Sequence, residues 1–538
     1  MGKVDVVVIG AGATGAGVAR DLALRGASVA LVDRGDFASG TSGRNHGLLH
    51  SGCRYAVEDR ETGAECIREN AIIRRIAAHC VDPCGGMFVG IEGDDPGYGP
   101  IFAEACAKAG IEARHIGPRE ALEREPNLTA KVREAYLVPD AAVDPFLLCL
   151  ANAVDAAEHG AEILTHHALR SITRGAGGVR GVVLEDVLTG ERREIGCRVV
   201  VNAAGPWAGE IAAKAGLVVG LVLSRGSLVV TRGRLVRGVV NRLRRPSDGD
   251  AIVPGGPVCL AGTTSIRVTS PDDLVPSSDE AQKLVDWASV LIPAFSSARV
   301  MREFTGIRPL YSEGGSGAGR EVSRGFAVLD HAARDGLEGF VTVVGGKLST
   351  YRLMAEKTAD VVASKLGVDT TCTTAERAMP GSEPHETTSP DGMPRWMARA
   401  IELRHGSRAA AAEAGAADAA ADGSDGGTRS RVCVCECVTE AELRFAMRRL
   451  FARTLGDLRR RTRLGMGPCQ GSTCGPRAAA LIAEEARLDP RRADRMLREF
   501  LEERDDGMLL VLRRGGAAQE EMNQSVARGF AAGAEGKP

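Results

Sequence analysis

Residues 4–15 read Val4-Asp5-Val6-Val7-Val8-Ile9-Gly10-Ala11-Gly12-Ala13-Thr14-Gly15. The β-branched run before Gly10 is typical of a strand buried inside a parallel sheet. Gly10 permits a tight turn, Gly12 lets a pyrophosphate approach the backbone, and Gly15 lets the next helix pack close to the sheet. The segment therefore predicts a strand, a glycine turn and a helix N-terminus whose free amides can meet phosphate groups.

The residues after this turn complete a nucleotide-binding βαβ unit. Ala16–Gly26 is periodically apolar and predicts a helix, Ser28–Val32 predicts a second strand, and Asp33 follows 18 residues after Gly15. A carboxylate at this distance can bind the hydroxyl pair of a ribose. The pattern favours a dinucleotide site, but it does not choose between FAD and NAD.

The composition is that of an ordinary globular protein. The chain has 538 residues, 44% hydrophobic and 26% charged, a length that indicates about two to four domains. Its net charge of −2 gives no general attraction to nucleic acid, so we expect no such partner. Neither a signal-peptide pattern nor an apolar run near the ~20 residues of a spanning helix is present, and we expect a cytoplasmic protein.

A loop after Asp33 is the first candidate for cofactor and substrate contacts. It runs from Ser39 to Tyr55, is rich in glycine and hydroxyl side chains, and holds two His and two Arg. Such a loop can align amides along a cofactor while a cation faces a substrate. Two later buried strands, in Arg198–Ala208 and Phe340–Arg352, end in small residues or a Gly-Gly turn, as a strand beside a cofactor requires.

Residues 217–310 alternate apolar strands with polar turns and predict a mostly antiparallel domain that carries the substrate pocket. Arg308 is followed by Pro309, which fixes the chain next to the guanidinium. The arginines in or near this domain are Arg225, Arg267, Arg308 and Arg324. The fold class we predict is α/β (α+β), with a Rossmann-like domain and an antiparallel-sheet domain.

Cysteines mark a further, C-terminal unit. Of the fourteen in the chain, five crowd into residues 433–474. Cys433 and Cys435 form a CxC pair, and after a 33-residue spacer Cys469 and Cys474 form a CxxxxC pair. Four thiolates on two such loops can enclose a [2Fe–2S] cluster. Structural zinc is the alternative, although its paired ligands are usually separated by about two to four residues.

Smaller signals complete this C-terminal part. Cys437 is a fifth thiol, which we interpret as a bystander or a substitute ligand. Thr439 and Glu442 predict a capping box, and Arg459–Arg463 is interpreted as a solvated helix face. Arg408–Ser430 predicts a linker. Leu488–Leu512 predicts a helix and a short strand, and the tail from Arg513 is expected to be disordered.

Four motifs together resemble the flavin-dependent glycerol-3-phosphate dehydrogenases: Gly43–Tyr55, Asn202–Trp207, Thr305–Leu310 and Gly345–Arg352. With the cysteine module, the chain resembles the A subunits of the anaerobic enzymes more closely still. The resemblance implies a D-amino-acid-oxidase-like FAD fold. It also implies oxidation of sn-glycerol 3-phosphate to dihydroxyacetone phosphate by hydride transfer from C2 to flavin N5. Electrons would pass through the cluster and flavin- and iron-sulfur-containing partner subunits, of B and C type, to quinone. The chain would then lie at the cytoplasmic membrane through those subunits.

The resemblance also assigns residues and domains. The substrate-site candidates are His50, Arg54, Arg308, Arg324 and Lys347, with His50 and Lys347 near the flavin. The FAD candidates are Gly10, Gly12, Thr14, Gly15, Asp33, Arg34, Thr41, Ser42, Arg44, Asn45, His46, Gly47, Ala204, Gly205, Gly345, Gly346, Lys347, Leu348, Ser349 and Thr350. The cluster candidates are Cys433, Cys435, Cys469 and Cys474.

The expected oxidoreductase spans 1–370, with FAD-binding parts at about 1–85, 145–215 and 325–370 and substrate parts at about 86–144 and 216–324. A connector follows at 371–430, a BFD-like [2Fe–2S] domain at 431–485, and a helix and tail at 486–538. Leu228 stands where aerobic relatives have His, so a mechanism based on that His does not transfer.

Two other functions remain open at this point. An amino-acid or opine oxidase could share the fold and the cysteine module, although it would need one Arg for a carboxylate and an apolar cage rather than several arginines. A non-catalytic electron-transfer protein with an inert flavin domain is the second alternative.

Overall fold

The computed structural model describes residues 2–312, 325–386, 393–414, 430–508 and 511. Its central element is a six-stranded sheet in the order β10-β3-β2-β14-β22-β21, with β21 antiparallel to the rest. The strands are β2 (Val6–Ile9), β3 (Val29–Val32), β10 (Glu162–Leu164), β14 (Val199–Asn202), β21 (Phe326–Asp330) and β22 (Phe340–Gly345). β2, β3 and β14 are fully buried, as their continuous apolar sequences predict.

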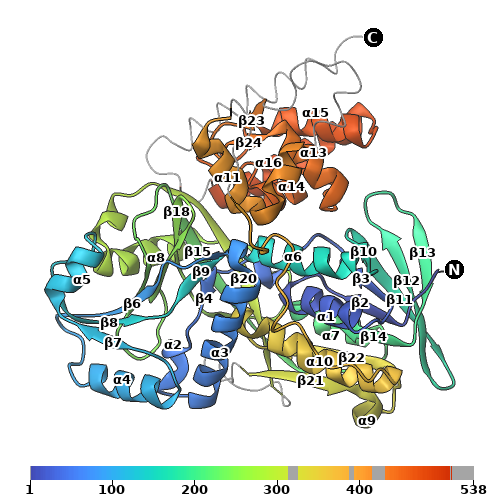
Figure 1. Ribbon diagram of the computed structural model, residues 1–538, viewed down its shortest axis with the longest axis horizontal. Coiled ribbons are helices and arrows are strands. Elements are labelled where there is room, and N and C mark those ends of the chain that lie inside the picture. Colours follow the sequence, from blue (N-terminus) through green and yellow to red (C-terminus); the bar gives the residue numbers. More distant parts are fainter. Residues whose placement is uncertain (1, 313–324, 387–392, 415–429, 509–510, 512–538) are drawn as a thin grey trace.

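Both faces of this sheet are covered (Figure 1). One face packs against α1 (Ala13–Leu24), α6 (Pro145–Glu158) and α10 (Tyr351–Leu366). The other face packs against a four-stranded sheet of β1 (Gly2–Lys3), β11 (His167–Gly175), β12 (Gly178–Asp186) and β13 (Arg192–Gly196), and against α7 (Ala208–Ala213). β12 and β13 pair antiparallel and form a hairpin around residues 188–190.

A larger, mostly antiparallel sheet forms the second domain, in the order β19-β15-β18-β17-β16-β6-β8-β7 with β20 paired to β15. Its strands are β6 (Gly86–Ile91), β7 (Arg114–Ile116), β8 (Val132–Val138), β15 (Leu221–Thr231), β16 (Val239–Arg242), β17 (Ala251–Gly255), β18 (Val258–Gly262), β19 (Ile266–Val268) and β20 (Val300–Tyr311). α8 (Ser278–Leu291) packs on one face. The antiparallel domain expected from residues 217–310 is therefore present.

Shorter elements join the two sheets. β4 (Leu48–Leu49), β5 (Val81–Asp82) and β9 (Ala141–Val143) form a three-stranded sheet beside α2 (Cys53–Ala56) and α3 (Arg60–Ile76). α4 (Tyr98–Lys108), α5 (Pro118–Arg124) and α9 (His331–Asp335) lie at the periphery (Figure 1). None of the helices in the described ranges combines the length and apolarity needed to cross a membrane.

The C-terminal module is mainly helical and lies over α6 (Figure 1). Its elements are α11 (Arg395–His405), α12 (Ala409–Ala414), β23 (Arg431–Cys433), β24 (Val438–Thr439), α13 (Glu440–Arg449), α14 (Leu455–Thr462), α15 (Gly475–Glu485) and α16 (Pro490–Met508). The capping box of Thr439 and Glu442 is confirmed. Ala409–Ala414 is helical where the composition predicts a linker, whereas residues 415–429, most of the expected strand 508–512 and the tail lie outside the described residues.

The interpretation of Arg459–Arg463 as a solvated face is wrong. Arg459 and Arg461 are buried, with 7% and 1% exposure, because Arg459 packs on Phe500 of α16 and Arg461 faces the N-terminal unit. Arg461 pairs with Asp36, which follows β3 in the N-terminal unit. A charged run on a helix looks the same in sequence whether it meets water or a carboxylate 425 residues away.

Candidate functional site

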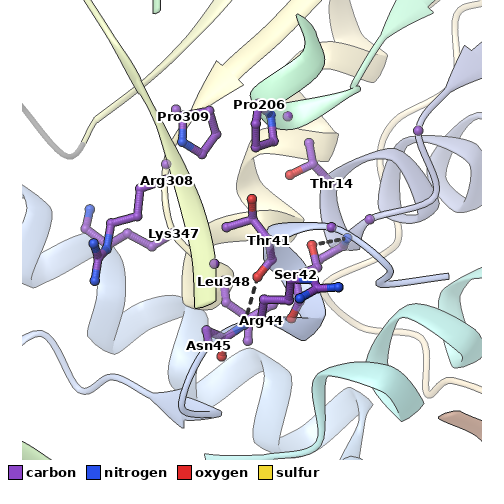
Figure 2. Close-up of a pocket in the computed structure, with 18 of the residues that line it drawn as sticks. Thr14, Thr41, Ser42, Arg44, Asn45, Pro206, Arg308, Pro309, Lys347 and Leu348 are labelled. Atoms are coloured by element: carbon purple, nitrogen blue, oxygen red, sulfur yellow. Dashed lines mark hydrogen bonds between the residues drawn. The ribbon is translucent and has the colours of Figure 1, made fainter. Parts of the chain in front are cut away.

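One large cavity, of about 990 Å³, lies where the two domains meet. It runs from the glycine turn after β2 and the end of β3 to β20 and the turn after β22. Figure 2 shows Thr14, Thr41, Ser42, Asn45, Pro206, Arg308 and Lys347 around this space. The predicted residues that line it are Gly10, Gly12, Thr14, Asp33, Arg34, Thr41, Ser42, Arg44, Asn45, His46, His50, Arg54, Ala204, Gly205, Arg308, Gly345, Gly346, Lys347, Leu348 and Ser349.

The remaining predicted residues lie elsewhere. Gly15 packs behind the wall, where an ideal Cβ would stand 1.8 Å from the carbonyl oxygen of Gly10. Gly47 has φ of +69° and accepts a hydrogen bond from Val143 N through its carbonyl. Thr350 is buried and accepts a hydrogen bond from the Lys347 amide. Arg324 lies outside the described residues.

The nucleotide end has the shape that a dinucleotide requires. At Gly10, with φ of +110°, a Cβ would lie 2.5 Å from the Ala203 carbonyl oxygen, and at Gly12 it would lie 2.9 Å from Ser42 Oγ. α1 begins directly after this turn, so its N-terminal amides face the cavity. Neither glycine leaves room for a side chain, and the tight turn they form brings backbone amides to the cavity wall, so the residues present fit a bound FAD.

Asp33 stands at the end of β3, as the sequence predicts. Its Oδ2 accepts from Ala11 N at 2.7 Å and its Oδ1 from Gly35 N at 2.8 Å. Burial raises the pKa of this carboxyl, and the two amide donors oppose that effect. Ser42 Oγ accepts from Ala13 N at 3.0 Å and ties the long loop to the helix N-terminus (Figure 2).

Two guanidiniums face the other end of the cavity. Arg54 donates to Ser247 O at 2.9 Å and to Asp250 Oδ2 at 3.3 Å. Arg308, on β20, donates to Thr264 O, Thr263 Oγ1 and Ser224 Oγ. Gly226 on the neighbouring β15 leaves room for it, because a Cβ there would lie 2.6 Å from Arg308 Nη2.

His46 reports how close these two cations are. Burial and then the charges of Arg54 and Arg308 lower the pKa of His46 to about 3. Its Nδ1 accepts from Leu48 N at 3.1 Å, which assigns the proton of the neutral ring to Nε2. His46 is therefore neutral near pH 7, and the positive charges of Arg54 and Arg308 both act on its ring.

Lys347 and His50 meet at Tyr55. The Lys347 ammonium lies 4.9 Å from the centre of the Tyr55 ring, and the His50 ring centre lies 5.5 Å from it. Figure 2 shows Lys347 and Arg308 extending to the same side of the cavity from two different elements. Three cations, from Arg54, Arg308 and Lys347, and two imidazoles, from His46 and His50, therefore converge at one end of the cavity.

Two residues of this site are not marked by the sequence pattern. Tyr55 ends the Gly43–Tyr55 motif without a predicted role, although it stands between Lys347 and His50. Asp250 is 2% exposed and accepts from Arg54, Arg244 and Ser247 N. Tyr55 could have been predicted from its position next to Arg54 in the sequence. Asp250 is 196 residues from Arg54 and comes close to it only in the folded chain.

The four predicted cluster ligands come together on two loops. Cys435 and Cys469 have their sulfurs 4.0 Å apart, and the Cys474 thiol is within hydrogen-bonding reach of Cys433 and Cys469. The sulfur of Cys437 points instead to Val434 O, at 3.6 Å. Over the described residues, no three His, Cys, Asp or Glu side chains form a ligand set for one metal ion. A [2Fe–2S] cluster divides its four thiolates between two irons and does not need such a set.

The surroundings of these sulfurs suit a cluster. The Cys474 thiol and the amides of Gly465 and Glu436 lower the pKa of Cys433 to about 6. Cys474 and the amides of Thr473 and Gly471 likewise lower the pKa of Cys469 to about 4. Gly467 lets the second loop approach the first, since a Cβ there would lie 2.2 Å from Cys435 Cβ. Amide donors to sulfur and close glycine packing fit a [2Fe–2S] group.

Comparison with known families agrees with both sites. The profile of the FAD dependent oxidoreductase family matches residues 5–352. The profile of the BFD-like [2Fe-2S] binding domain matches residues 431–484. The chain therefore combines an FAD-dependent oxidoreductase domain with a [2Fe-2S]-binding domain, and the predicted cofactors are confirmed at this level.

Similar proteins extend over almost the whole chain. The A subunit of the anaerobic glycerol-3-phosphate dehydrogenase of Escherichia coli K12 is 44% identical over 532 residues, which is 98% of this chain and 96% of that protein. Its counterpart in Haemophilus influenzae is 43% identical over 94% of this chain and 89% of that protein. The A1 subunit of the Haloferax volcanii enzyme is 42% identical over 89% of this chain and 83% of that protein.

Solved structures agree on the fold. The glycerol-3-phosphate dehydrogenase from Bacillus halodurans, solved with FAD, superposes with a TM-score of 0.73 at 24% identity, over 95% of this chain and 96% of that one. A glycine oxidase from Bacillus cereus superposes with a TM-score of 0.54 at 21% identity, over 67% of this chain and 95% of that one. The predicted D-amino-acid-oxidase-type fold is confirmed, and the sequence relatives decide the family. The chain belongs to the family of anaerobic glycerol-3-phosphate dehydrogenase A subunits.

Proposed function

We propose that this chain oxidises sn-glycerol 3-phosphate to dihydroxyacetone phosphate. The observation that carries the proposal is the convergence of Arg54, Arg308 and Lys347 at one end of the dinucleotide cavity. A phosphate dianion suits such a set, because guanidiniums bind phosphate oxygens through paired N–H donors. The whole-length similarity to glycerol-3-phosphate dehydrogenases supports the same substrate.

In this proposal Arg54 and Arg308 bind the phosphate and Leu228 lines the pocket beside them. Asp250 keeps the Arg54 side chain extended toward the cavity, and Thr263 and Thr264 do the same for Arg308. Because these contacts exist before the substrate binds, the two arginine side chains lose little conformational entropy on binding. An amino-acid substrate would use one of these arginines and leave the second charge unmatched.

Bound FAD supplies the hydride acceptor for C2 of the substrate. The chain must then take the proton of the C2 hydroxyl, and His50 and Lys347 are the candidate groups for that transfer. Tyr55 holds both in place through its ring. Lys347 also brings a positive charge to the turn after β22, where negative charge on the reduced cofactor would be stabilised.

We further propose that the cluster passes electrons singly to iron-sulfur-containing partner subunits and then to a quinone, with the chain held at the cytoplasmic membrane by those subunits. Cys435 is exposed, unlike Cys433 and Cys474, and Val434 beside it is 64% exposed. A one-electron acceptor can therefore approach the cluster at this loop. The names of the relatives, which designate them as A subunits, support the presence of partners.

An anaerobic absorbance titration tests the substrate. Addition of glycerol 3-phosphate to the oxidised holoenzyme is expected to bleach the flavin band with formation of an equivalent amount of dihydroxyacetone phosphate. Glycine, proline and glycerol at the same concentration serve as controls and should leave the band unchanged. A flavin that dithionite reduces but glycerol 3-phosphate does not would overturn the proposal.

A further inference from the structure

The C-terminal module packs against the loop that follows Asp33, the residue expected to bind the ribose. Arg461 of α14 donates from Nη1 and Nη2 to the two oxygens of Asp36, at 2.5 and 2.6 Å, and both side chains are 1% exposed. Arg460 adds a third contact to Asp36 at 3.0 Å. Asp36 lies three residues after Asp33, so this interface acts on the segment that also forms the nucleotide end of the cavity.

Apolar and polar contacts surround this ion pair. The Arg461 guanidinium lies 4.8 Å from the centre of the Phe37 ring, which meets Phe451 of the module edge to face at 6.1 Å. His166 contacts the buried Asp457 at 2.9 Å. The charge of Arg461 cannot return to water without breaking this packing, and a buried charge separated from its partner is strongly unfavourable. The module is therefore held in one orientation.

A second bridge connects the cluster loop with the flavin-binding loop. Arg463 donates to Glu436, the residue after Cys435, at 2.9 Å, and lies 3.9 Å from Asp144. The residue before Asp144 is Val143, whose N–H donates to Gly47 O at 2.7 Å. Arg463 adopts φ of +64° as the left-handed residue that ends α14.

We propose that Asp36 is a positioning residue that fixes the [2Fe–2S] module on the dinucleotide-binding loop, so that electrons pass from flavin to cluster inside one chain without movement of the module. This inference rests on the proposed redox function. Each substrate gives up two electrons and two protons. The cluster accepts one electron at a time and is reoxidised twice per turnover by the one-electron acceptor proposed above.

The alternative is a module that undocks and swings between the flavin and the acceptor. The two arrangements differ in what the interface does to the rate. A fixed module passes electrons both to and from the cluster more slowly when the interface is weakened. A swinging module passes electrons from the cluster to the acceptor faster when the interface is weakened, because undocking then limits that step.

The test compares Asp36→Asn with the wild type, and Asp494→Asn, at a side chain of α16 that is 41% exposed, is the matched control. In stopped-flow mixing with glycerol 3-phosphate, Asp36→Asn is expected to bleach flavin at the wild-type rate but to reduce the cluster at least tenfold more slowly. Cluster reduction is followed by its own absorbance and by the electron paramagnetic resonance signal of the reduced state. Arg461→Lys, which retains the charge, should fall between the two.

Hydrogen exchange on the resting holoenzyme is the readout that needs no turnover. The amides of α14 are expected to exchange faster in Asp36→Asn and at the wild-type rate in Asp494→Asn. If Asp36→Asn fails to retain FAD, His166→Gln tests the same interface through Asp457. Unchanged exchange, or faster reoxidation of the cluster by an added one-electron acceptor in Asp36→Asn, would overturn the inference. Failure of the wild-type flavin to bleach would count against the substrate only, since the exchange result stands on its own.

Discussion

The two arginines that we propose bind the substrate are held in different ways. Arg308 donates to neutral hydroxyl and carbonyl oxygens of residues 224, 263 and 264, which orient a guanidinium without cancelling its charge. Arg54 shares the carboxylate of Asp250 with Arg244. We therefore expect Arg308 to supply more of the binding energy for an anion, and Arg54 to depend on Asp250 for its position.

The first prediction concerns Arg308. Arg308→Ala should raise the KM for glycerol 3-phosphate by roughly 10- to 100-fold, the loss expected for one charge-assisted contact of about 1.5–3 kcal/mol. Steady-state kinetics with a dye acceptor measures this, and Arg119→Ala, at a side chain that is 93% exposed, is the control. An unchanged KM would remove Arg308 from the phosphate site.

A second residue-scale prediction separates the two proton-transfer candidates. If His50 is the base, His50→Gln should lower kcat by about 10²- to 10⁴-fold and abolish the acid limb of the kcat–pH profile. Lys347→Gln should then lower kcat but leave that limb in place. Retention of the limb in His50→Gln would assign the base elsewhere.

At the scale of the element, α13 is held by a buried polar contact. Glu442 caps its own helix through Thr439 and accepts from Arg404 Nε at 2.8 Å and His405 Nε2 at 3.1 Å, both on α11. Although burial alone would raise it, the Arg404 charge and the His405 contact hold the pKa of Glu442 at about 2. The carboxylate therefore stabilises the fold above its ordinary pKa of 4.5, and this contribution declines as the pH falls from 4.5 toward 2.

Glu442→Gln tests this contact. It should destabilise the module by roughly 3–5 kcal/mol at pH 7, because the buried Arg404 loses its charge partner. The wild type should lose up to about 1.4 kcal/mol per pH unit below pH 4.5 from this group, and the variant should not. Urea unfolding from pH 7 to pH 3 measures both, with the exposed Glu484→Gln as control. Parallel pH curves for variant and wild type would contradict the assignment.

The two cysteine loops give a further element-scale prediction. Single Ser substitutions at Cys433, Cys435, Cys469 or Cys474 should remove the cluster absorbance and leave FAD content unchanged, whereas Cys437→Ser should retain both. Iron and sulfide analysis of the purified variants is the measurement. Two irons and two sulfides per wild-type chain would exclude zinc, and loss of the cluster in Cys437→Ser would add that thiol to the ligands.

At the scale of the whole molecule, local sequence patterns are enough for the sheets but not for the interfaces. The β2–α1–β3 unit, the antiparallel domain and the two cysteine loops each carry their signal within a short segment, and all three are present. The partnership of Arg461 with Asp36 spans 425 positions, and that of Arg54 with Asp250 spans 196. No local period or spacing marks such pairs, so the sequence places Arg459–Arg463 in solvent and gives no sign of Asp250.

A prediction about ionic strength belongs to this scale. The Asp36–Arg461 pair is 1% exposed on both sides, and buried pairs are screened far less than surface ones. The radius of gyration from small-angle scattering should therefore stay the same when NaCl is raised from about 0.05 to 0.5 M, although the Debye length shrinks from roughly 14 to 4 Å. Expansion of the particle would show that exposed charges hold the module instead.

The short distance in sequence between Asp33 and Asp36 has a consequence for how the enzyme matures. One carboxylate faces the cofactor cavity and the other anchors the cluster module, on the same turn of chain. FAD binding that orders this turn also favours docking of the module, and docking favours FAD binding by the same free energy. In chains made under riboflavin shortage, which lack FAD, the iron-sulfur module would therefore dock less tightly. FAD would bind first, and the module would dock in its electron-transfer position afterwards.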